Sequence, residues 1–235
     1  MAHLSGNQID ELGRRLRDAE PPSEGDLRLF EQLLGEHAEA LDKVNGALSR
    51  LGLQGHPRMK STDMTREKLR REKLSLRGIH DLAGTRVVKR MTLDEQDEIV
   101  EQIRSGCPGA SPPIDRRAVP NNGYRAVHVV CQVDGRWVEI QIRTFYQDTW
   151  AQLMEKMGDW YGRQIRYGEL PNRPDEILTP ENGTTVSQLI GTMINMSSAI
   201  ATLEESENTE APDDGHPVRK FIYTMREQMN MPEVS

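Results

Sequence analysis

The sequence predicts an α/β (α+β) fold in which a small mixed, partly antiparallel β-sheet is flanked by helices. Two runs rich in β-branched residues meet at Asp134-Gly135, a dipeptide typical of a two-residue hairpin turn. Apolar residues at helical spacing occur both before this hairpin, over residues 23–51, and after it, over residues 146–161. Strands enclosed by helices at both ends predict a sheet-centred core with N- and C-terminal helical extensions.

Local signals place each element in turn. Ser23 with Asp26 forms a capping pattern at the start of the first long helix, and Gly52 ends it. Residues 56–62 are expected to be a loop that becomes helical by about Thr65. The remaining predicted elements are a strand over 81–88, a helix over 93–104, a short strand over 114–119, the hairpin over 122–144, and helices over 146–161, 184–203 and 217–229.

Length and composition narrow the class of protein. A chain of 235 residues with 36% hydrophobic content can bury one sizeable core with extensions. We expect an N-terminal helical extension over 1–53, a core over 54–168 and a C-terminal helical extension over 169–235, with an acidic linker near 204–216. No apolar run reaches the length of a membrane span, and the first residues lack a signal-peptide pattern, so a cytoplasmic protein without membrane contact and with reduced thiols is expected.

Charge is distributed unevenly along the chain. The net charge of -7 argues against a general nucleic-acid coat. Residues 58–77 nevertheless have a local excess of Lys and Arg, and the acids around 204–214 balance it. Such a basic stretch fits either a solvated helix surface or a binding surface, and the sequence leaves both open.

The hairpin places chemically distinctive side chains on one face. If Asp134 and Gly135 form the turn, Val133 pairs with Arg136 and His128 faces Gln141. Because side chains alternate along strands, one face then carries Tyr124, Ala126, His128, Glu139, Gln141 and Arg143. A solvated sheet face also produces polar alternation. A carboxylate, an amide, an imidazole, a guanidinium and a phenol gathered on one face indicate a ligand site instead.

Cations and carboxylates complete the candidate site. Arg58, Lys60 and Lys68 lie at a loop-to-helix junction, where free backbone N–H groups and the helix dipole also favour anions. Such a junction suits a triphosphate. Asp81 and Glu139 supply oxygen ligands of the kind that Mg²⁺ accepts alongside substrate phosphates.

Four motifs in order resemble the synthetase domain of RelA/SpoT-type alarmone synthetases. They are Arg58-x-Lys60 with Lys68, Asp81-Leu-Ala-Gly-Thr-Arg-Val-Val, Asn122-Gly-Tyr-Arg-Ala-Val-His128, and Glu139-Ile-Gln-Ile-Arg-Thr144 followed by Trp150-Ala151. The similarity covers roughly residues 50–165. It implies a nucleotidyltransferase-like synthetase fold and a Mg-dependent transfer of pyrophosphate from ATP to the 3'-hydroxyl of GDP or GTP, which yields (p)ppGpp and AMP.

The resemblance also implies roles for individual residues. It places Arg58, Lys60 and Lys68 on ATP, and Asp81 and Glu139 on magnesium, with Glu139 also orienting or deprotonating the attacking hydroxyl. It places Tyr124 against the acceptor base, and Asn122, His128 and Gln141 on the acceptor nucleotide. The chain departs from the family pattern at Met64, where Ser or Thr is usual, and at Glu155, where His is often found.

Two other functions fit the same motifs. Some small family members are toxins, paired with antitoxins, that pyrophosphorylate the tRNA 3' end or adenosine nucleotides. A third interpretation is an inactive nucleotide sensor or partner-binding module. The chain resembles a stand-alone small synthetase, and its terminal helices fit either homo-oligomer surfaces or internal packing. The sequence leaves the acceptor, the oligomeric state, any allosteric ligand and any antitoxin open.

Overall fold

The described residues of the computed structural model are 3–180, 182–206 and 216–228. They group into two compact units that alternate along the chain. The first unit contains residues 1–87, 100–113 and 128–141, and the second contains residues 88–99, 114–127 and those from 142 onward. The long hairpin therefore contributes to both units.

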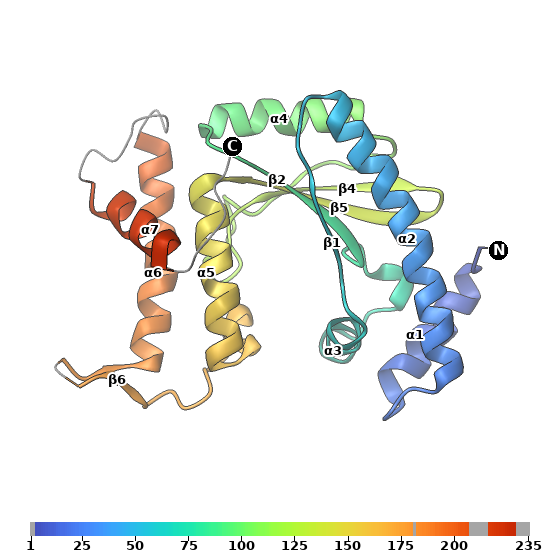
Figure 1. The fold of residues 1–235 in the computed structure, drawn as a ribbon, viewed down its shortest axis with the longest axis horizontal. Helices are drawn as coiled ribbons and strands as arrows, with labels where there is room; N and C mark the ends of the chain where they lie inside the picture. Colours follow the sequence, from blue (N-terminus) through green and yellow to red (C-terminus); the bar gives the residue numbers. More distant parts are fainter. Residues whose placement is uncertain (1–2, 181, 207–215, 229–235) are drawn as a thin grey trace. The chain divides into compact units, whose positions relative to one another are not determined.

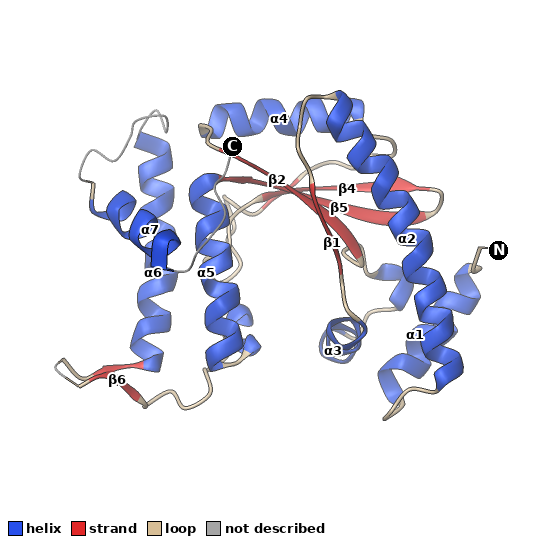
Figure 2. Ribbon diagram, in the orientation of Figure 1, coloured by secondary structure: helices blue, strands red, loops and turns tan. Residues whose placement is uncertain are grey.

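A five-stranded sheet runs through the structure in the order β1-β2-β5-β4-β3 (Figures 1 and 2). Its strands are β1 (His56–Met59), β2 (Ala83–Lys89), β3 (Ile114–Asp115), β4 (Val127–Val133) and β5 (Arg136–Thr144). Helices precede, interrupt and follow these strands. The predicted fold class, a small mixed sheet flanked by helices, is confirmed.

Strand β1 corrects the sequence interpretation, which placed residues 56–62 in a loop. It pairs antiparallel with β2, so that Arg58 lies opposite Gly84 and Met59 lies opposite Ala83. Pro57 cannot donate a ladder hydrogen bond, and β1 accommodates it as the outermost strand of the sheet. The pairing between β1 and β2 is regular along these residues, so Gly84 does not form a β-bulge.

The hairpin turn has the predicted residues. Asp134 and Gly135 have φ angles of 50° and 74°, the positive values that a type I′ turn requires at both central positions. Strand β4, however, begins at Val127 and not at residue 122. Asn122 and Gly123, with φ angles of 49° and 87°, form a separate tight turn closed by backbone hydrogen bonds in both directions between Asn121 and Tyr124.

Helices α1 (Gly6–Asp18), α2 (Glu24–Arg50), α3 (Thr62–Glu72) and the short η1 (Leu76–Gly78) belong to the first unit. The predicted start of α2 is confirmed, because the Ser23 hydroxyl accepts from the Asp26 N–H. His37 is buried on the apolar stripe, and its Nδ1 lies 2.9 Å from the Leu33 carbonyl oxygen. The core of these helices consists of Leu4, Ile9, Leu12, Leu16, Phe30, Leu33, Leu69, Leu76, Ile79 and Leu82.

Hydrogen bonds and an ion pair hold the N-terminal helices against the hairpin. Arg136, the first residue of β5, donates from Nε to the Glu36 carboxylate of α2 at 2.8 Å and from Nη2 to the Leu4 carbonyl at 2.9 Å. Lys43 of α2 forms an ion pair with Asp134 in the turn. These contacts show that the extension packs within its own chain and supports the strand that carries Glu139.

Helix α4 (Leu93–Gly106) contributes residues to both units, and the second unit is built largely from the chain after β5. Helices α5 (Phe145–Tyr161), α6 (Val186–Ser206) and α7 (Pro217–Gln228) lie beside one another (Figure 1). A 3-10 segment, η2 (Arg163–Tyr167), follows α5, and an unpredicted two-stranded sheet of β6 (Ile177–Thr179) and β7 (Thr184–Thr185) precedes α6. The apolar residues at helical spacing over 146–161 pack in the core of this unit, and Trp150 donates to the Met193 carbonyl at 2.6 Å.

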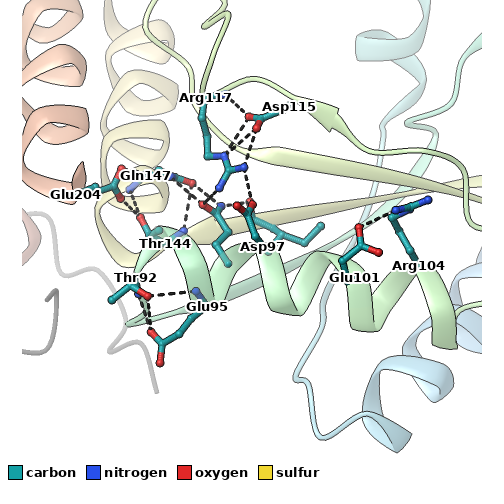
Figure 3. Close-up of polar contacts among 12 residues, drawn as sticks. Thr92, Glu95, Asp97, Glu101, Arg104, Asp115, Arg117, Thr144, Gln147 and Glu204 are labelled. Carbon is teal, nitrogen blue, oxygen red and sulfur yellow. Dashed lines mark hydrogen bonds and ion pairs between the residues drawn. The ribbon is translucent and has the colours of Figure 1, made fainter. Parts of the chain in front are cut away.

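A buried polar network joins α6 to the end of β5 (Figure 3). Thr144 caps α5 and donates to the Glu204 carboxylate, and Gln147 donates to its other oxygen at 3.3 Å. Gln147 also accepts from Gln96 at 2.9 Å, and Gln96 donates to the Ile142 carbonyl at 3.0 Å. The prediction that Glu204 lies in an acidic linker is therefore wrong, whereas residues 207–215 lie outside the described residues.

Among the described helices, none combines the length and the apolar content that crossing a lipid bilayer requires.

The network predicts a pH-dependent contribution to stability. Burial raises the pKa of Glu204 from 4.5 to about 6, and the hydrogen bonds from Thr144 and Gln147 offset it only in part. Since the folded pKa is the higher one, this contribution is fully present below pH 4.5 and is lost as the pH rises to about 6. The shift corresponds to about 2 kcal/mol.

Thermal and urea unfolding of the wild type and of Glu204→Gln between pH 4 and 7 checks this. The wild type should lose about 2 kcal/mol relative to the variant as the pH rises. A constant difference between the two proteins across this range would contradict the assignment.

Candidate active site

Two lysines meet at one aspartate in the first unit. Lys60 follows β1, where its backbone N–H donates to the Leu82 carbonyl at 2.8 Å, and Asp81 immediately precedes Leu82. The Lys60 ammonium lies 3.0 Å from one Asp81 oxygen, and the Lys68 ammonium of α3 lies 3.0 Å from the other. Both lysines and the aspartate are partly buried. The structure thus brings together three of the residues predicted from the sequence.

The start of α3 lies next to this cluster in the chain. Ser61 caps the helix by accepting from the Met64 N–H at 3.3 Å. Arg58 is exposed in β1, and its Nη2 lies 3.9 Å from the Met64 sulfur. Met64, where the chain departs from the family pattern, is therefore in contact with Arg58, which is predicted to bind ATP.

The hairpin contributes a second polar cluster, of His128, Glu139 and Gln141. His128 Nδ1 lies 3.2 Å from a Glu139 oxygen, and Gln141 donates to the other Glu139 oxygen at 2.7 Å. The side chains of His128 and Glu139 are only 12% and 15% exposed. The contact between His128 and Glu139 is the one expected for diagonal neighbours in the predicted register.

Glu139 is ionised despite its burial. Burial alone would raise its pKa, but the contacts with His128 and Gln141, together with the charge of Lys68, lower it to about 2. Lys68 therefore acts on both carboxylates: it is hydrogen-bonded to Asp81, and its charge stabilises ionised Glu139. Both clusters lie within the first unit, and the charge of Lys68 is the contribution of the donor-side cluster to the low pKa of Glu139.

The two carboxylates suit a magnesium ion that is completed by substrate. Among the described residues, no group of three or more His, Cys, Asp or Glu side chains could hold a metal alone. Mg²⁺ commonly binds through one or two carboxylates together with substrate phosphates. Asp81 is in contact with two lysines, and Glu139 is in contact with an imidazole and an amide. The carboxylate oxygens of both residues are ligands of the kind that such a site uses.

Tyr124 and Asn122 belong to the second unit and are held by contacts of their own. The Tyr124 hydroxyl accepts from Arg143 at 3.0 Å, and the Arg143 guanidinium lies 5.1 Å from the ring centroid. Asn122 donates from Nδ2 to the Ile165 carbonyl at 2.6 Å. The amide of Asn122 thus braces the turn that presents Tyr124, and its predicted contact with an acceptor nucleotide stays a prediction.

Arg143 was predicted to share the candidate-site face with Tyr124 but was given no role of its own, and Asp148 was not predicted to belong to the site. Arg143 donates to Asp148 at 2.9 Å, and both side chains are almost fully buried. This pair fixes the guanidinium that holds the Tyr124 hydroxyl. The signal was available for Arg143, because the predicted hairpin register put it on the same face as Tyr124.

Much of the basic run over 58–77 serves the fold. Arg66 donates to the carbonyls of Leu16 and Ala19 at 3.0 and 2.7 Å, and Arg70 donates to that of Arg17 at 2.9 Å. These bonds satisfy carbonyls at the end of α1 that have no partner within the helix. Arg71 and Arg77 form ion pairs with neighbouring acids. Arg66 and Arg70 are therefore structural, whereas the ion pairs of Arg71 and Arg77 lie at the surface and leave the solvated-surface and binding-surface interpretations open for them.

Comparisons with known proteins now identify the family. Residues 57–158 match the model of the region found in RelA / SpoT proteins. An uncharacterized protein of Mycobacterium tuberculosis and one of Mycobacterium bovis are each 36% identical over 226 residues, covering 93% of this chain and 81% of each relative. The chain belongs to the RelA/SpoT family. The resemblance inferred from the four motifs is confirmed.

Solved structures show that this RelA/SpoT family member has the fold of small alarmone synthetases. The small alarmone synthetase 2 of Bacillus subtilis matches with a TM-score of 0.55 at 21% identity, over 75% of this chain and 94% of that chain. The small alarmone synthetase 1 of Bacillus subtilis, bound to its product pppGpp, matches with a TM-score of 0.54 at 18% identity, over 76% of this chain and 95% of that chain.

Gly84 permits a close approach of β2 to the strand of Glu139. A Cβ atom at residue 84 would lie 3.1 Å from the Glu139 carbonyl oxygen. Gly84→Ala should therefore push the two backbones apart and lower the free energy of unfolding by about 1 kcal/mol. Gly35→Ala is the matched control, since nothing lies within 4 Å of its added Cβ in α2, and it should stabilise the helix by up to about 1 kcal/mol. Equal effects in urea unfolding would contradict this role of Gly84.

Proposed function

We propose that this protein catalyses Mg-dependent transfer of pyrophosphate from ATP to the 3'-hydroxyl of GDP or GTP, producing (p)ppGpp and AMP. The observation that supports this most directly is the cluster in which the ammonium groups of Lys60 and Lys68 each lie 3.0 Å from one oxygen of Asp81. Two lysines at one candidate metal carboxylate are suited to a site in which phosphate and metal charges meet. Family membership supports the same class of reaction.

The donor side binds ATP through cations. Arg58, Lys60 and Lys68 lie on β1, at the start of α3 and within α3, and two of them already meet at Asp81. A triphosphate offers these ammonium groups several oxygens, while magnesium on Asp81 and Glu139 would neutralise phosphate charge. Positioning and charge neutralisation are the main requirements of phosphoryl-group transfer.

The acceptor side positions a hydroxyl group. A new bond forms between the 3'-oxygen and the β-phosphorus of ATP, the bond from that phosphorus to the oxygen shared with the α-phosphate breaks, and AMP leaves. Glu139, kept ionised by His128 and Gln141, orients this hydroxyl by accepting its hydrogen bond. Gln141 and His128 supply further contacts to the acceptor nucleotide, and Tyr124 supplies a ring on which its base can stack.

The toxin alternative, with tRNA or an adenosine nucleotide as acceptor, uses the same donor chemistry. Its tRNA form needs the basic run as a docking surface, but Arg66, Arg70, Arg71 and Arg77 are engaged within the chain. This observation favours a mononucleotide acceptor. The inactive-sensor alternative gives no role to Glu139, whose pKa is lowered by its contacts with His128 and Gln141 despite its burial. A cytoplasmic location, where these nucleotides occur, is part of the proposal.

Transfer of label from γ-labelled ATP to GDP, GTP, ATP or deacylated tRNA tests the function. Label should appear on GDP or GTP, with one AMP released per transfer. Label on tRNA or on the adenosine acceptor alone would favour the toxin alternative, and no label on any acceptor would favour the sensor.

Glu139→Gln should abolish transfer, because the neutral amide cannot replace the charge of the carboxylate at this point. ATP binding, measured by equilibrium titration, should change much less. Glu98→Gln, an exposed acid on α4, is the control and should keep full activity. A fully active Glu139→Gln protein would contradict the role of Glu139 in orienting the acceptor hydroxyl.

Lys68→Met should weaken ATP binding about 10- to 100-fold, the effect of losing a charge-assisted hydrogen bond. Lys220→Met, at an exposed position on α7, controls for the loss of one positive charge. Titration of each variant with a non-hydrolysable ATP analogue measures the difference, and equal affinities would exclude Lys68 from the donor site.

Tyr124→Ala should weaken acceptor binding by about 1 to 3 kcal/mol if a base stacks on the ring. Tyr124→Phe keeps the ring and removes only the hydroxyl that Arg143 holds, so its acceptor KM should lie near the wild-type value. Acceptor KM measured at saturating ATP distinguishes the two variants. Equal losses in both would mean that the hydroxyl, and not the ring, carries the effect.

A further inference from the structure

The two cysteines of the chain lie together in the first unit. Cys107 follows α4 and Cys131 lies in β4. They are the only cysteines in the sequence, and both are free and buried. Neither residue belongs to the candidate active site, so the inference drawn from them goes beyond the proposed function and does not depend on it.

The backbone holds these cysteines near each other. Residues 109–111 run along β4, with Ala110 forming an antiparallel bridge to Cys131. The Gln132 N–H donates to the Gly109 carbonyl at 3.0 Å, and the Ser111 N–H donates to the Val130 carbonyl at 2.8 Å. These bonds flank Cys131 on both sides and fix the segment that begins at Cys107.

Gly109 shows how tight this approach is. Its φ angle is 64°, and a Cβ atom at this position would lie 2.3 Å from the Gln132 carbonyl oxygen. The chain can reach β4 in this way only with glycine there. The backbone therefore holds Cys107 three residues before the residue that pairs with Cys131.

The two thiols are not equivalent in their acidity and exposure. The hydrogen bond from Cys131 and the charge of Arg50 lower the pKa of Cys107, although burial opposes this. The same hydrogen bond, with burial, raises the pKa of Cys131. Cys107 is also the more accessible of the two, at 6% against 0% exposure. Reactivity of a thiol follows its thiolate fraction and its access to the reagent.

We infer that Cys107 and Cys131 form a reversible intramolecular disulfide when the protein meets a peroxide. The Cys107 thiolate attacks one oxygen of hydrogen peroxide, the O–O bond breaks, and Cys107 becomes a sulfenic acid while hydroxide leaves. The Cys131 sulfur then displaces the hydroxyl group from that sulfenic acid, forming the S–S bond. In total two thiols lose two electrons and two protons, and one peroxide becomes two waters.

The disulfide would tie the end of α4 to the strand that carries His128. Cys131 lies three residues after His128, and side-chain alternation puts the two on opposite faces of β4. Oxidation would therefore act on the core side of this strand without occupying the face of Glu139 and Gln141.

Peptide mapping of the full-length protein tests the inference. Fully reduced protein is treated with hydrogen peroxide, alkylated and digested with trypsin without reductant. The tryptic peptides 105–116 and 126–136 should then be joined by a disulfide that dithiothreitol reverses. Two alkylated thiols, or only sulfinic and sulfonic acids, would overturn the inference.

Variants of each cysteine test whether disulfide formation depends on the positions of the two residues in the fold. Cys131→Ser should leave Cys107 as a sulfenic acid that dimedone traps, whereas Cys107→Ser should react with peroxide at least about tenfold more slowly, as expected for the fully buried Cys131 thiol. In urea, dimedone should trap more of the wild-type Cys107 sulfenic acid, because unfolding lowers the effective concentration of Cys131 that the fold supplies. Equal trapping with and without urea, or equal reactivity of the two single variants, would contradict the assigned roles.

Discussion

The ion pairs at Asp81 hold the donor side of the candidate active site together. The Lys60 ammonium, just after β1, and the Lys68 ammonium of α3 each lie 3.0 Å from one Asp81 oxygen. Glu139 is kept ionised chiefly by its contacts with His128 and Gln141, and the charge of Lys68 adds to their effect. The position of α3 against the sheet is thus part of the electrostatics of the site as well as a packing result.

That position depends on contacts that reach back to the N-terminus. Arg66 and Arg70 of α3 bind carbonyls at the end of α1, and Arg136 at the start of β5 binds Glu36 and Leu4. The N-terminal helices are therefore part of the scaffold of the first unit. Two arginines of the basic run, Arg66 and Arg70, belong to this scaffold.

Much of the fold and of the site followed from local sequence signals. The Ser23 cap defined α2, Asp134-Gly135 defined the hairpin, and alternation placed His128 beside Glu139 and Gln141. Strand β1 was missed because four residues containing proline show no periodicity, and their structure comes from pairing with β2. Glu204 was missed because a charge run resembles a linker, whereas its burial depends on Thr144, sixty residues away in the chain. The Asn122-Gly123 turn had a recognisable signal, but the strand pattern that follows it was extended too far back.

The Asn122-Gly123 turn also links the start of the hairpin to the C-terminal region. Asn122 binds the Ile165 carbonyl, Ser197 of α6 donates to the Gly123 carbonyl, and a Cβ atom at Gly123 would collide with Trp150. Helices of the C-terminal region therefore set where the Tyr124 ring stands. A substitution in α6 would thus act on a turn that lies 74 residues earlier in the chain.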